Sequence, residues 1–252
     1  MRWVRFSHHG QTAYGRMDGD RIFMLKGDPY SGTLCETGEH LALSEVKLLA
    51  PSDPTKIVAV GKNYRDHAAE LDGAIPDHMI LFLKPASAVL HPGEDIIRPR
   101  GVKRLDYEGE LAFLVAKKAK DVPPERAAEY ILGYTALNDV TARDVQADDG
   151  QWTRAKSYDT FCPFGPVVTD EVDPEALHIE TRLNGRVVQS SNTRMMTWGA
   201  AEILAYVTSC MTLYPGDVVT TGTPAGIGPM QTGDIVEVEI EGIGCLRNGV
   251  AE

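Results

Sequence analysis

Short apolar runs bounded by polar residues recur along the chain, and they predict strands rather than long helices. Three such runs are Lys56–Gly61, Met79–Leu83 and Leu111–Val115, each with the length of a buried strand. Between residues 234 and 240 apolar and polar positions alternate strictly, which is typical of a strand with one face in water. Strands are therefore expected to be the main elements of the fold.

Pairs of Asp or Asn with glycine predict two hairpins, at Asp18–Gly19 and Asn184–Gly185. The first lies within residues 1–50, which we interpret as a small N-terminal β domain. The segment 50–55 carries two prolines among polar neighbours and is typical of a linker. We therefore expect the remaining residues, 51–252, to form a second and larger domain.

Three stretches favour helices. The first is helix-compatible until Asp72–Gly73, which is expected to stop it. The second begins with proline and ends with glycine, as helices often do. In the third, apolar residues recur at helical spacing and Thr197 is a candidate N-cap. The three stretches are Lys62–Leu71, Pro123–Gly133 and Trp198–Met211.

Composition limits the classes of function. The 252 residues are 43% hydrophobic and 24% charged, which is ordinary for a globular protein of one or two domains. A net charge of -11 argues against a general affinity for nucleic acid or anionic membranes, although a few local cations can still bind an anionic substrate. We expect no transmembrane helix, because no apolar run approaches ~20 residues, and no signal peptide. The four cysteines form no C-x-x-C pair, so we expect buried free thiols in a cytoplasmic protein.

The most informative chemistry precedes the apolar run at residues 111–115. Glu108 and Glu110 lead into this strand and, at strand spacing, lie on the same side. Each carboxylate raises the pKa of the other and burial raises both, so a divalent cation would help to keep the pair ionised. Asp139, in a polar break after another apolar stretch, can complete such a site. The alternative is a strand end whose outer face is solvated.

A second group of residues can carry proton transfer. On a helix His67 and Glu70 are neighbours, which is the arrangement of a general base oriented by a carboxylate. They can equally be a weak pair on an exposed helix. Lys156 can face a substrate or lie on the surface. The glycine-rich loop around Thr223 can offer N–H groups and a hydroxyl to a carboxylate, or it can be a structural turn.

Six motifs resemble those of the fumarylacetoacetate hydrolase family, in the short branch that acts on acylpyruvates, 2-hydroxyhepta-2,4-diene-1,7-dioate and related 2-oxo acids. They cover about residues 55–245, and six motifs in the family's order are far more specific than any one alone. The motifs lie at Gly61–Leu71, Phe82–Ser87, Leu105–Leu111, Asn138–Gln146, Ala155–Pro166 and Thr221–Gly228.

The resemblance implies an α+β, β-rich fold in which a mixed β-roll or barrel catalytic domain follows a small N-terminal β domain, and it implies a homodimer. It also implies roles for nine residues by their motif positions. These are the metal ligands Glu108, Glu110 and Asp139, the catalytic residues His67, Glu70 and Lys156, and the substrate-binding residues Arg143, Gln146 and Thr223. Arg143 can instead form only a helical ion pair with Asp139, four residues earlier.

The expected reaction follows from these roles. Three carboxylate oxygens with open water positions suit Mg²⁺, with Mn²⁺ or Ca²⁺ as alternatives. A 2-oxo acid can chelate such an ion, which then stabilises the enolate formed when a C–C bond breaks. His67 would activate water while Lys156 and Arg143 offset developing charge. We therefore expect hydrolysis of an acylpyruvate or fumarylpyruvate type of substrate to pyruvate and an acid.

Two other activities can use the same enolate. Decarboxylation of an oxaloacetate-type substrate needs no attacking water, and an enol–keto shift in a 2-hydroxydienedioate, as in an isomerase, needs only a proton relay. A protein that binds a metal or a carboxylate without catalysis is a third interpretation. The complete set of ligands, lysine and dyad argues against it. The chemistry of the substrate's distal group stays open at this point.

Overall fold

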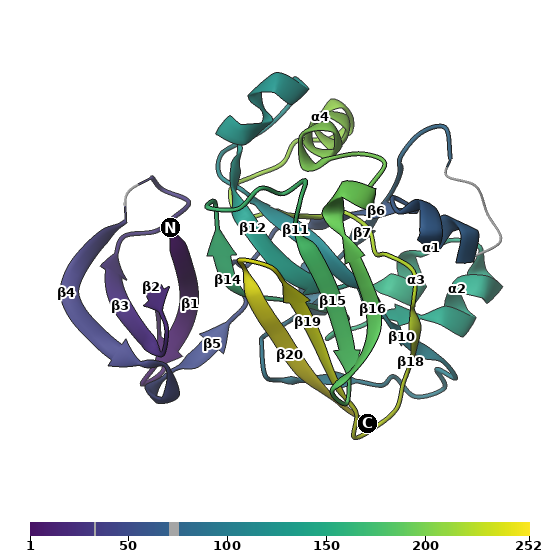
Figure 1. Ribbon diagram of the computed structural model, residues 1–252, viewed down its shortest axis with the longest axis horizontal. Helices are drawn as coiled ribbons and strands as arrows, with labels where there is room; N and C mark the ends of the chain where they lie inside the picture. Colours follow the sequence, from purple (N-terminus) through teal and green to yellow (C-terminus); the bar gives the residue numbers. More distant parts are fainter. Residues whose placement is uncertain (33, 71–75) are drawn as a thin grey trace.

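Most of the regular structure is β-strand. Figure 1 shows β1 (Arg2–His8) to β5 (Lys47–Leu49) as a small unit beside a larger body. Between the two lies β14 (Cys162–Thr169), which pairs with β1 and joins both parts in one hydrogen-bonded sheet. The predicted α+β, β-rich class is confirmed. The structure, a computed structural model, describes residues 1–32, 34–70 and 76–252.

A twelve-stranded sheet runs through both parts. Its order is β4-β3-β2-β1-β14-β12-β11-β17-β6-β7, with β5 beside β1 and β8 beside β14. Because β8 follows β7 in the chain yet pairs with β14 on the other side of β12, the sheet rolls up. The strands not yet bounded are β2 (Gln11–Asp18), β3 (Arg21–Lys26), β4 (Cys35–Ala42), β6 (Ile57–Gly61), β7 (Ile80–Lys84), β8 (Val89–Leu90), β11 (Gly109–Val115), β12 (Ile131–Asn138) and β17 (Val218–Thr220).

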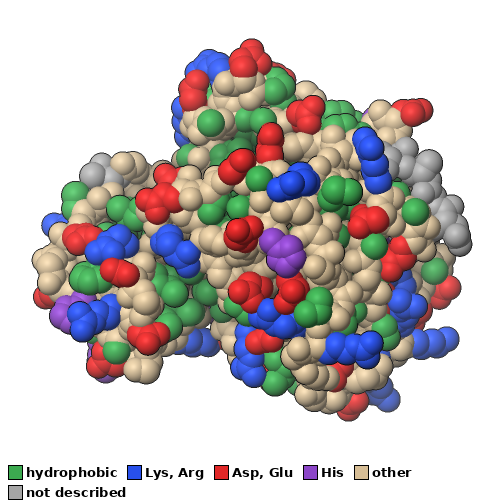
Figure 2. Space-filling view, in the orientation of Figure 1, with side chains coloured by type: hydrophobic (Ala, Val, Ile, Leu, Met, Phe, Trp, Pro, Cys, Tyr) green, Lys and Arg blue, Asp and Glu red, His purple; other side chains and the backbone are tan. Residues whose placement is uncertain are grey.

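Two smaller sheets complete the larger body, with the orders β13-β10-β18 and β16-β15-β19-β20-β9. Their strands are β9 (Asp95–Ile97), β10 (Leu105–Tyr107), β13 (Thr141–Ala142), β15 (His178–Leu183), β16 (Arg186–Asn192), β18 (Gly228–Met230), β19 (Ile235–Ile240) and β20 (Gly244–Ala251). Figure 2 shows acidic and basic side chains gathered over β15, β19 and β20. On this surface Arg182 forms ion pairs with Glu180, Glu237 and Glu239.

The strand β11 is buried along its whole length. Phe113 packs in the cluster that includes the helix α4 (Ala200–Cys210), and Leu111 packs against the five-stranded sheet. Because strand side chains alternate, Ala112 and its even-numbered neighbours face the interior of the roll instead. Glu110 has the same parity as Ala112, so its carboxylate also enters the roll.

The helices are few and short. None of the described helices has the length and hydrophobicity that crossing a bilayer requires. Besides α4, the α-helices are α1 (Arg65–Glu70), α2 (Arg143–Asp149) and α3 (Thr153–Lys156), and the 3₁₀ helices are η1 (Leu43–Glu45), η2 (Ala86–Ala88), η3 (Pro124–Glu129) and η4 (Thr193–Met195).

The predicted helix at residues 123–133 is wrong in type and length. Only the 3₁₀ helix η3 forms there, because Ile131 already pairs with Val115 and begins β12. The first predicted helix is present as α1, and its expected end at Asp72–Gly73 lies outside the described residues.

The predicted N-cap of α4 is also wrong. Gly199 is the N-cap, and its N–H donates to the carboxylate of Glu202. Thr197 lies two residues earlier, where its own N–H donates to the carbonyl oxygen of Asn63. This tertiary bond determines the path of the chain into α4.

Both predicted hairpins form, one of them shifted. Asn184–Gly185 joins β15 and β16 with φ values of 51° and 77°, the positive angles that a tight two-residue hairpin requires. In the first hairpin Asp18 pairs with Arg21, so the loop is Gly19–Asp20, one residue later than predicted.

One strand and two cysteines are more exposed than predicted. The strand β7 lies at the end of the sheet path with β6 as its neighbour, and Leu83 on it is 46% exposed. An apolar run does not distinguish such an edge strand from a central one. Cys35 and Cys210 are exposed, whereas Cys162 is buried as expected, and all four thiols are free.

The division of the chain at residues 50 and 51 stays a prediction.

Candidate active site

A cavity of about 280 Å³ lies where the ends of β6 and β11 meet the helices α1, α2 and α3. Eight of the nine residues singled out from the sequence line it, and the ninth, Glu70, contacts one of these eight. The structure therefore brings together residues from 67 to 223. The eight are His67, Glu108, Glu110, Asp139, Arg143, Gln146, Lys156 and Thr223.

Three buried carboxylates converge in the wall of this cavity. Glu108 stands between β10 and β11, Glu110 lies within β11, and Asp139 directly follows β12. The register of these two strands pairs Gly109 with Asn138, which puts all three acids at one edge of the sheet. One oxygen of each carboxylate lies within 4.8 Å of the others. The Asp139 N–H donates to Glu108 O over 2.8 Å and holds the two segments together.

Two buried lysines offset this negative charge. Nζ of Lys156 lies 2.8 Å from Glu108 Oε2 and 2.6 Å from Asp139 Oδ2. Nζ of Lys84, at the end of β7, lies 2.5 Å from Asp139 Oδ1. Sequence reasoning missed Lys84, although it lies in the motif Phe82–Ser87. Lys84 and Asp139 are 55 positions apart in the sequence, and they come into contact because the sheet rolls up.

The carboxylates differ in their electrostatic surroundings. Burial opposes the ionisation of Glu108, but Lys156 and Arg143 hold its pKa below the usual range. Burial raises the pKa of Glu110, and the negative charges of Asp139 and Glu108 raise it further. Burial also opposes the charge on Lys156, yet the adjacent carboxylates raise its pKa, so the ammonium group persists. Glu110 is therefore the acid of the cluster that most lacks a positive neighbour.

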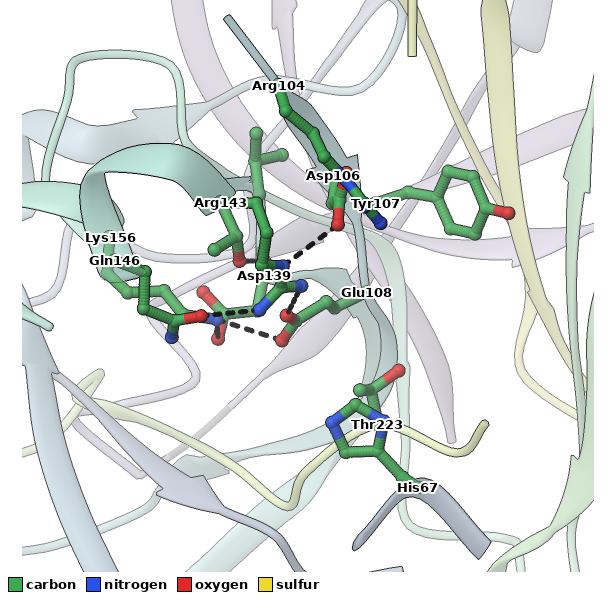
Figure 3. A network of polar contacts seen from close by, with 12 residues as sticks. His67, Arg104, Asp106, Tyr107, Glu108, Asp139, Arg143, Gln146, Lys156 and Thr223 are labelled. Atoms are coloured by element: carbon green, nitrogen blue, oxygen red, sulfur yellow. Dashed lines mark hydrogen bonds and ion pairs between the residues drawn. The ribbon is translucent and has the colours of Figure 1, made fainter. Parts of the chain in front are cut away.

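Arg143 is held by three acceptors (Figure 3). Its Nε lies 2.9 Å from Asp106 Oδ2, and its Nη1 lies 2.6 Å from Gln146 Oε1. A third bond joins its Nη2 to Glu108 Oε1. Asp106 is fully buried and was not singled out from the sequence. The alternative ion pair with Asp139 is not among the ion pairs of the described residues, because Asp139 precedes α2 and is not part of it.

His67 and Glu70 meet on α1. His67 Nδ1 lies 3.1 Å from Glu70 Oε2, and the imidazole is buried. The same carboxylate accepts the N–H of Gly226 over 3.1 Å, which ties α1 to the loop before β18. Because Nδ1 is occupied, Nε2 is the ring nitrogen available to the cavity.

Thr223 lines the cavity with its hydroxyl already bonded. Its Oγ1 donates to Gly109 O over 2.9 Å and accepts a bond from Gln189 Nε2 over 2.8 Å. Gln189 Oε1 also accepts the Gly109 N–H over 3.0 Å. These bonds lock the loop to the start of β11. A hydroxyl bond from Thr223 to a substrate carboxylate stays a prediction, and it requires the bond to Gly109 to exchange.

The donor set suits a small hard cation. Oxygen atoms from three carboxylates are the ligands that Mg²⁺, Mn²⁺ and Ca²⁺ prefer. The raised pKa of Glu110 is a sign that this position lacks a positive charge. Beside the acids, the cations of Arg143 and Lys156 can hold an anionic ligand, and His67 can move a proton. These are the parts of a metal-assisted proton-transfer site.

Comparison with known proteins agrees with this geometry. Residues 56–251 match the family model described as fumarylacetoacetate hydrolase, C-terminal. The chain belongs to the fumarylacetoacetate hydrolase family. Within this family its N-terminal part, residues 1–51, matches a second model described as Rv2993c-like, N-terminal. The family predicted from the six motifs is thereby confirmed.

Among the proteins similar to this fumarylacetoacetate hydrolase family member, some are named for an activity. Protein Rv2993c of Mycobacterium tuberculosis is 48% identical over 264 residues, covering 99% of this chain and 98% of that protein. The mitochondrial oxaloacetate tautomerase fahd2 of Xenopus laevis is 40% identical over 229 residues, covering 85% of this chain and 72% of that protein. Among solved structures, 5-carboxymethyl-2-hydroxymuconate delta-isomerase of Mycobacterium smegmatis has a TM-score of 0.93 at 41% identity, covering 100% of this chain and 99% of that one.

Proposed function

We propose that this chain transfers a proton next to the keto group of a small 2-oxo dicarboxylic acid and so interconverts its keto and enol forms. The observation that carries the proposal is the buried carboxylate triad, which shares one cavity with the imidazole of His67. The names of two relatives, an oxaloacetate tautomerase and a hydroxymuconate isomerase, support the same class of reaction. The small volume of the cavity suits a substrate of this size.

We propose Mg²⁺ as the ion held by Glu108, Glu110 and Asp139, with Mn²⁺ and Ca²⁺ as ions that fit the same oxygens. When bound, such an ion supplies Lewis-acid stabilisation of negative charge on the substrate's keto oxygen. The convergence of three carboxylates supports this assignment.

His67 carries the proton in this proposal. Glu70 occupies Nδ1 and orients the ring, so Nε2 takes a proton from the carbon beside the keto group, which leaves an enolate, and returns it to the enolate oxygen or to a more distant carbon. Lys156 stays protonated and offsets charge that develops on the substrate oxygen. The guanidinium of Arg143 has five N–H donors, of which three are used by protein acceptors. Its remaining donors, with Gln146, bind the carboxylate at the keto end.

Hydrolytic C–C cleavage is the second candidate. A histidine oriented by Glu70 can take a proton from water as well as from carbon, and the family model is named after a hydrolase. In that reaction Lys156 would offset the oxyanion formed at the attacked carbonyl. The products would be pyruvate and an acid from an acylpyruvate or fumarylpyruvate type of substrate.

A panel of 2-oxo acids separates these activities in protein loaded with Mg²⁺. We expect the enol absorbance of oxaloacetate to decay faster with the protein than without it, and pyruvate to form no faster than in Mg²⁺ alone. Faster cleavage of acylpyruvates with release of pyruvate would place hydrolysis first. Formation of pyruvate and carbon dioxide from oxaloacetate faster than in Mg²⁺ alone would indicate decarboxylation.

The same assay tests the role of the dyad. We expect His67→Ala to lower the main activity by about 10²-fold to 10⁴-fold, the usual range for a general acid or base. His178→Ala is the matched control, because His178 is exposed on β15. Equal activity in His67→Ala and the parent would remove His67 from the mechanism.

We also infer that two copies of the chain associate and that the protein works in the cytoplasm. The support is the family resemblance for the first and the free thiols for the second. Sedimentation at about the mass of two chains is expected, since paired subunits are the commonest assembly of soluble oligomers. Sedimentation as a single chain at micromolar concentration would contradict the dimer.

A further inference from the structure

Lys62 adds a cation to the cavity that the proposed mechanism does not use. It directly follows Gly61 at the end of β6, and its half-buried side chain lines the cavity. Its backbone φ is 56°, in the left-handed region that residues other than glycine seldom adopt. Such conformations persist where the surrounding structure holds them, and they concentrate at functional sites.

The residue after Lys62 shows how this backbone is held. The amide of Asn63 donates to Trp198 O over 2.9 Å and to Thr221 O over 2.8 Å, and it accepts the Trp198 N–H over 2.9 Å. Asn63 is fully buried. Buried hydrogen bonds of the adjacent Asn63 therefore hold the backbone from which the Lys62 side chain starts.

Arg143 and Lys156, which also line the cavity, each have two protein carboxylates as partners. Arg143 is bonded to Asp106 and Glu108, and Lys156 to Glu108 and Asp139. Within the residues that the structure describes, the ammonium group of Lys62 has neither an ion pair nor a hydrogen bond. Its ammonium group is thus available to pair with the carboxylate of a bound anion.

An apolar wall connects Lys62 to the catalytic end of the cavity. The ring of Trp152 packs on Gly61 so closely that a Cβ there would lie 2.4 Å from the ring. The Trp152 and Phe82 rings lie 5.2 Å apart, and Nζ of Lys156 lies 5.1 Å from the centre of the Phe82 ring. Arg143 lines the catalytic end of the same cavity, so cations on either side of a hydrocarbon surface match an anion with two carboxylates joined by a carbon chain.

We propose that Lys62 binds the distal carboxylate of the substrate and thereby selects 2-oxo dicarboxylic acids over 2-oxo monocarboxylic acids. This inference rests on the proposed function, because it takes the keto end of the substrate to lie at the carboxylate triad. The cavity volume of about 280 Å³ is large enough for a four-carbon diacid.

The test compares oxaloacetate with 2-oxobutanoate, which has the same chain length and no distal carboxylate. Deuterium exchange at carbon 3, followed by NMR in protein loaded with Mg²⁺, measures the proposed proton transfer on both. For Lys62→Met we expect kcat/KM for oxaloacetate to fall by about tenfold to a hundredfold, as for the loss of a charged hydrogen bond. The value for 2-oxobutanoate should change less than about twofold. Lys62→Arg should keep most of the preference, and Lys118→Met, an exposed lysine remote from the cavity, should match the parent.

Binding of oxalate is the second measurement. The two carboxylates of oxalate are directly bonded and mimic only the keto end of the substrate, so oxalate has no distal carboxylate. Its affinity in calorimetry should therefore be the same for Lys62→Met and the parent. If Lys62→Met keeps the parent's preference for the diacid, the inference about Lys62 is wrong while the proposed function stands. If oxalate binding falls together with diacid activity, Lys62 supports the whole site and the selective role is wrong.

Failure of the proposed function is distinguishable from these outcomes. If the parent exchanges deuterium into neither substrate, the proposed proton transfer is wrong. Calorimetry with the same two acids then decides the inference by itself. A preference for the diacid that is present in the parent and lost in Lys62→Met supports it, and equal affinities in the parent overturn it.

Discussion

Two clusters of arginine and carboxylates lie in this molecule, and their surroundings differ. The side chain of Arg143 is 15% exposed and contacts Asp106 and Glu108, which are 0% and 7% exposed. Arg182 on the five-stranded sheet is 24% exposed, and its partner Glu239 is 49% exposed. Water and salt screen the second cluster, whereas the first has little water to replace a lost partner. The same residue types therefore have different consequences for stability.

The clusters also differ in completeness. On the surface Arg182 has three carboxylate partners, each within reach of solvent. In the cavity Glu110 accepts bonds from Thr220 and from the Gly222 N–H, and the ion pairs of the described residues include none to Glu110. Among the described residues Glu110 is therefore the carboxylate of the buried cluster that has no ion-pair partner. Substitutions at Lys84, Asp139, Glu110 and Arg182 test this difference between the buried and the exposed cluster.

The largest effect is expected for Lys84→Met. The substitution keeps most of the length of the side chain but leaves the buried Asp139 without one of its two lysines. Loss of one partner of a buried ion pair costs about 3–5 kcal/mol of unfolding free energy. Urea denaturation measures this loss, and Lys118→Met on the surface is the control. A loss below about 1 kcal/mol would put the buried cluster in the same class as the surface one.

The next effect concerns Asp139→Asn. Hard cations depend on charged oxygen ligands, so Mg²⁺ affinity should fall by at least ~tenfold. Calorimetry measures it, with Glu239→Gln from the surface cluster as the control. Unchanged Mg²⁺ affinity in Asp139→Asn would remove this residue from the ligand set.

The third effect is a dependence of Mg²⁺ affinity on pH. Because the pKa of Glu110 is raised, the metal-free site holds a proton that the metal-loaded site releases. Raising the pH towards this pKa removes the competing proton, so affinity should increase with pH by up to about tenfold per unit. Calorimetry in buffers of different ionisation enthalpy counts the released protons. Glu110→Gln should abolish the dependence, and an affinity in the parent that does not rise as the pH increases above 4.5, the ordinary pKa of glutamate, would contradict it.

The smallest effect is expected for Arg182→Met. Exposed ion pairs contribute about 0.2–1 kcal/mol each, and salt screens them. Urea denaturation at low and high salt should show a small loss of unfolding free energy that salt reduces further. A loss of several kcal/mol that is independent of salt would show that this surface cluster behaves like the buried one.

Local chemistry predicted local structure well. Asn184–Gly185 forms its hairpin because both residues tolerate positive φ, whatever lies elsewhere in the chain. The alternation at residues 235–240 likewise appears as the half-exposed strand β19. The helix expected at 123–133 failed for a non-local reason. Pairing of Ile131 with β11 competes with helix formation, and the helical pattern carries no information about that pairing.

The site was predictable through the order of its motifs, not through single residues. Glu108 and Glu110 alone were compatible with a solvated strand end, and only the six motifs together argued against it. The predicted residues converge in the structure, whereas their roles as ligands and catalysts stay predictions. Lys84 and Asp106 escaped notice because their ion pairs depend on how the sheet rolls and how α2 returns to β10.

The two contacts of Glu70 tie the orientation of the His67 imidazole, the proposed base, to the packing of α1 on the loop that contains Gly226. The carboxylate contacts both His67 and the Gly226 N–H, so a molecule in which α1 leaves this loop has lost the orientation of its imidazole as well. The observed rate is then the intrinsic rate multiplied by the docked fraction. Gly226 has a φ of 101°, and a Cβ there would lie 2.2 Å from Val188 O. If His67 acts as proposed, a residue other than glycine at position 226 would therefore lower turnover. It would leave the affinity for the metal unchanged.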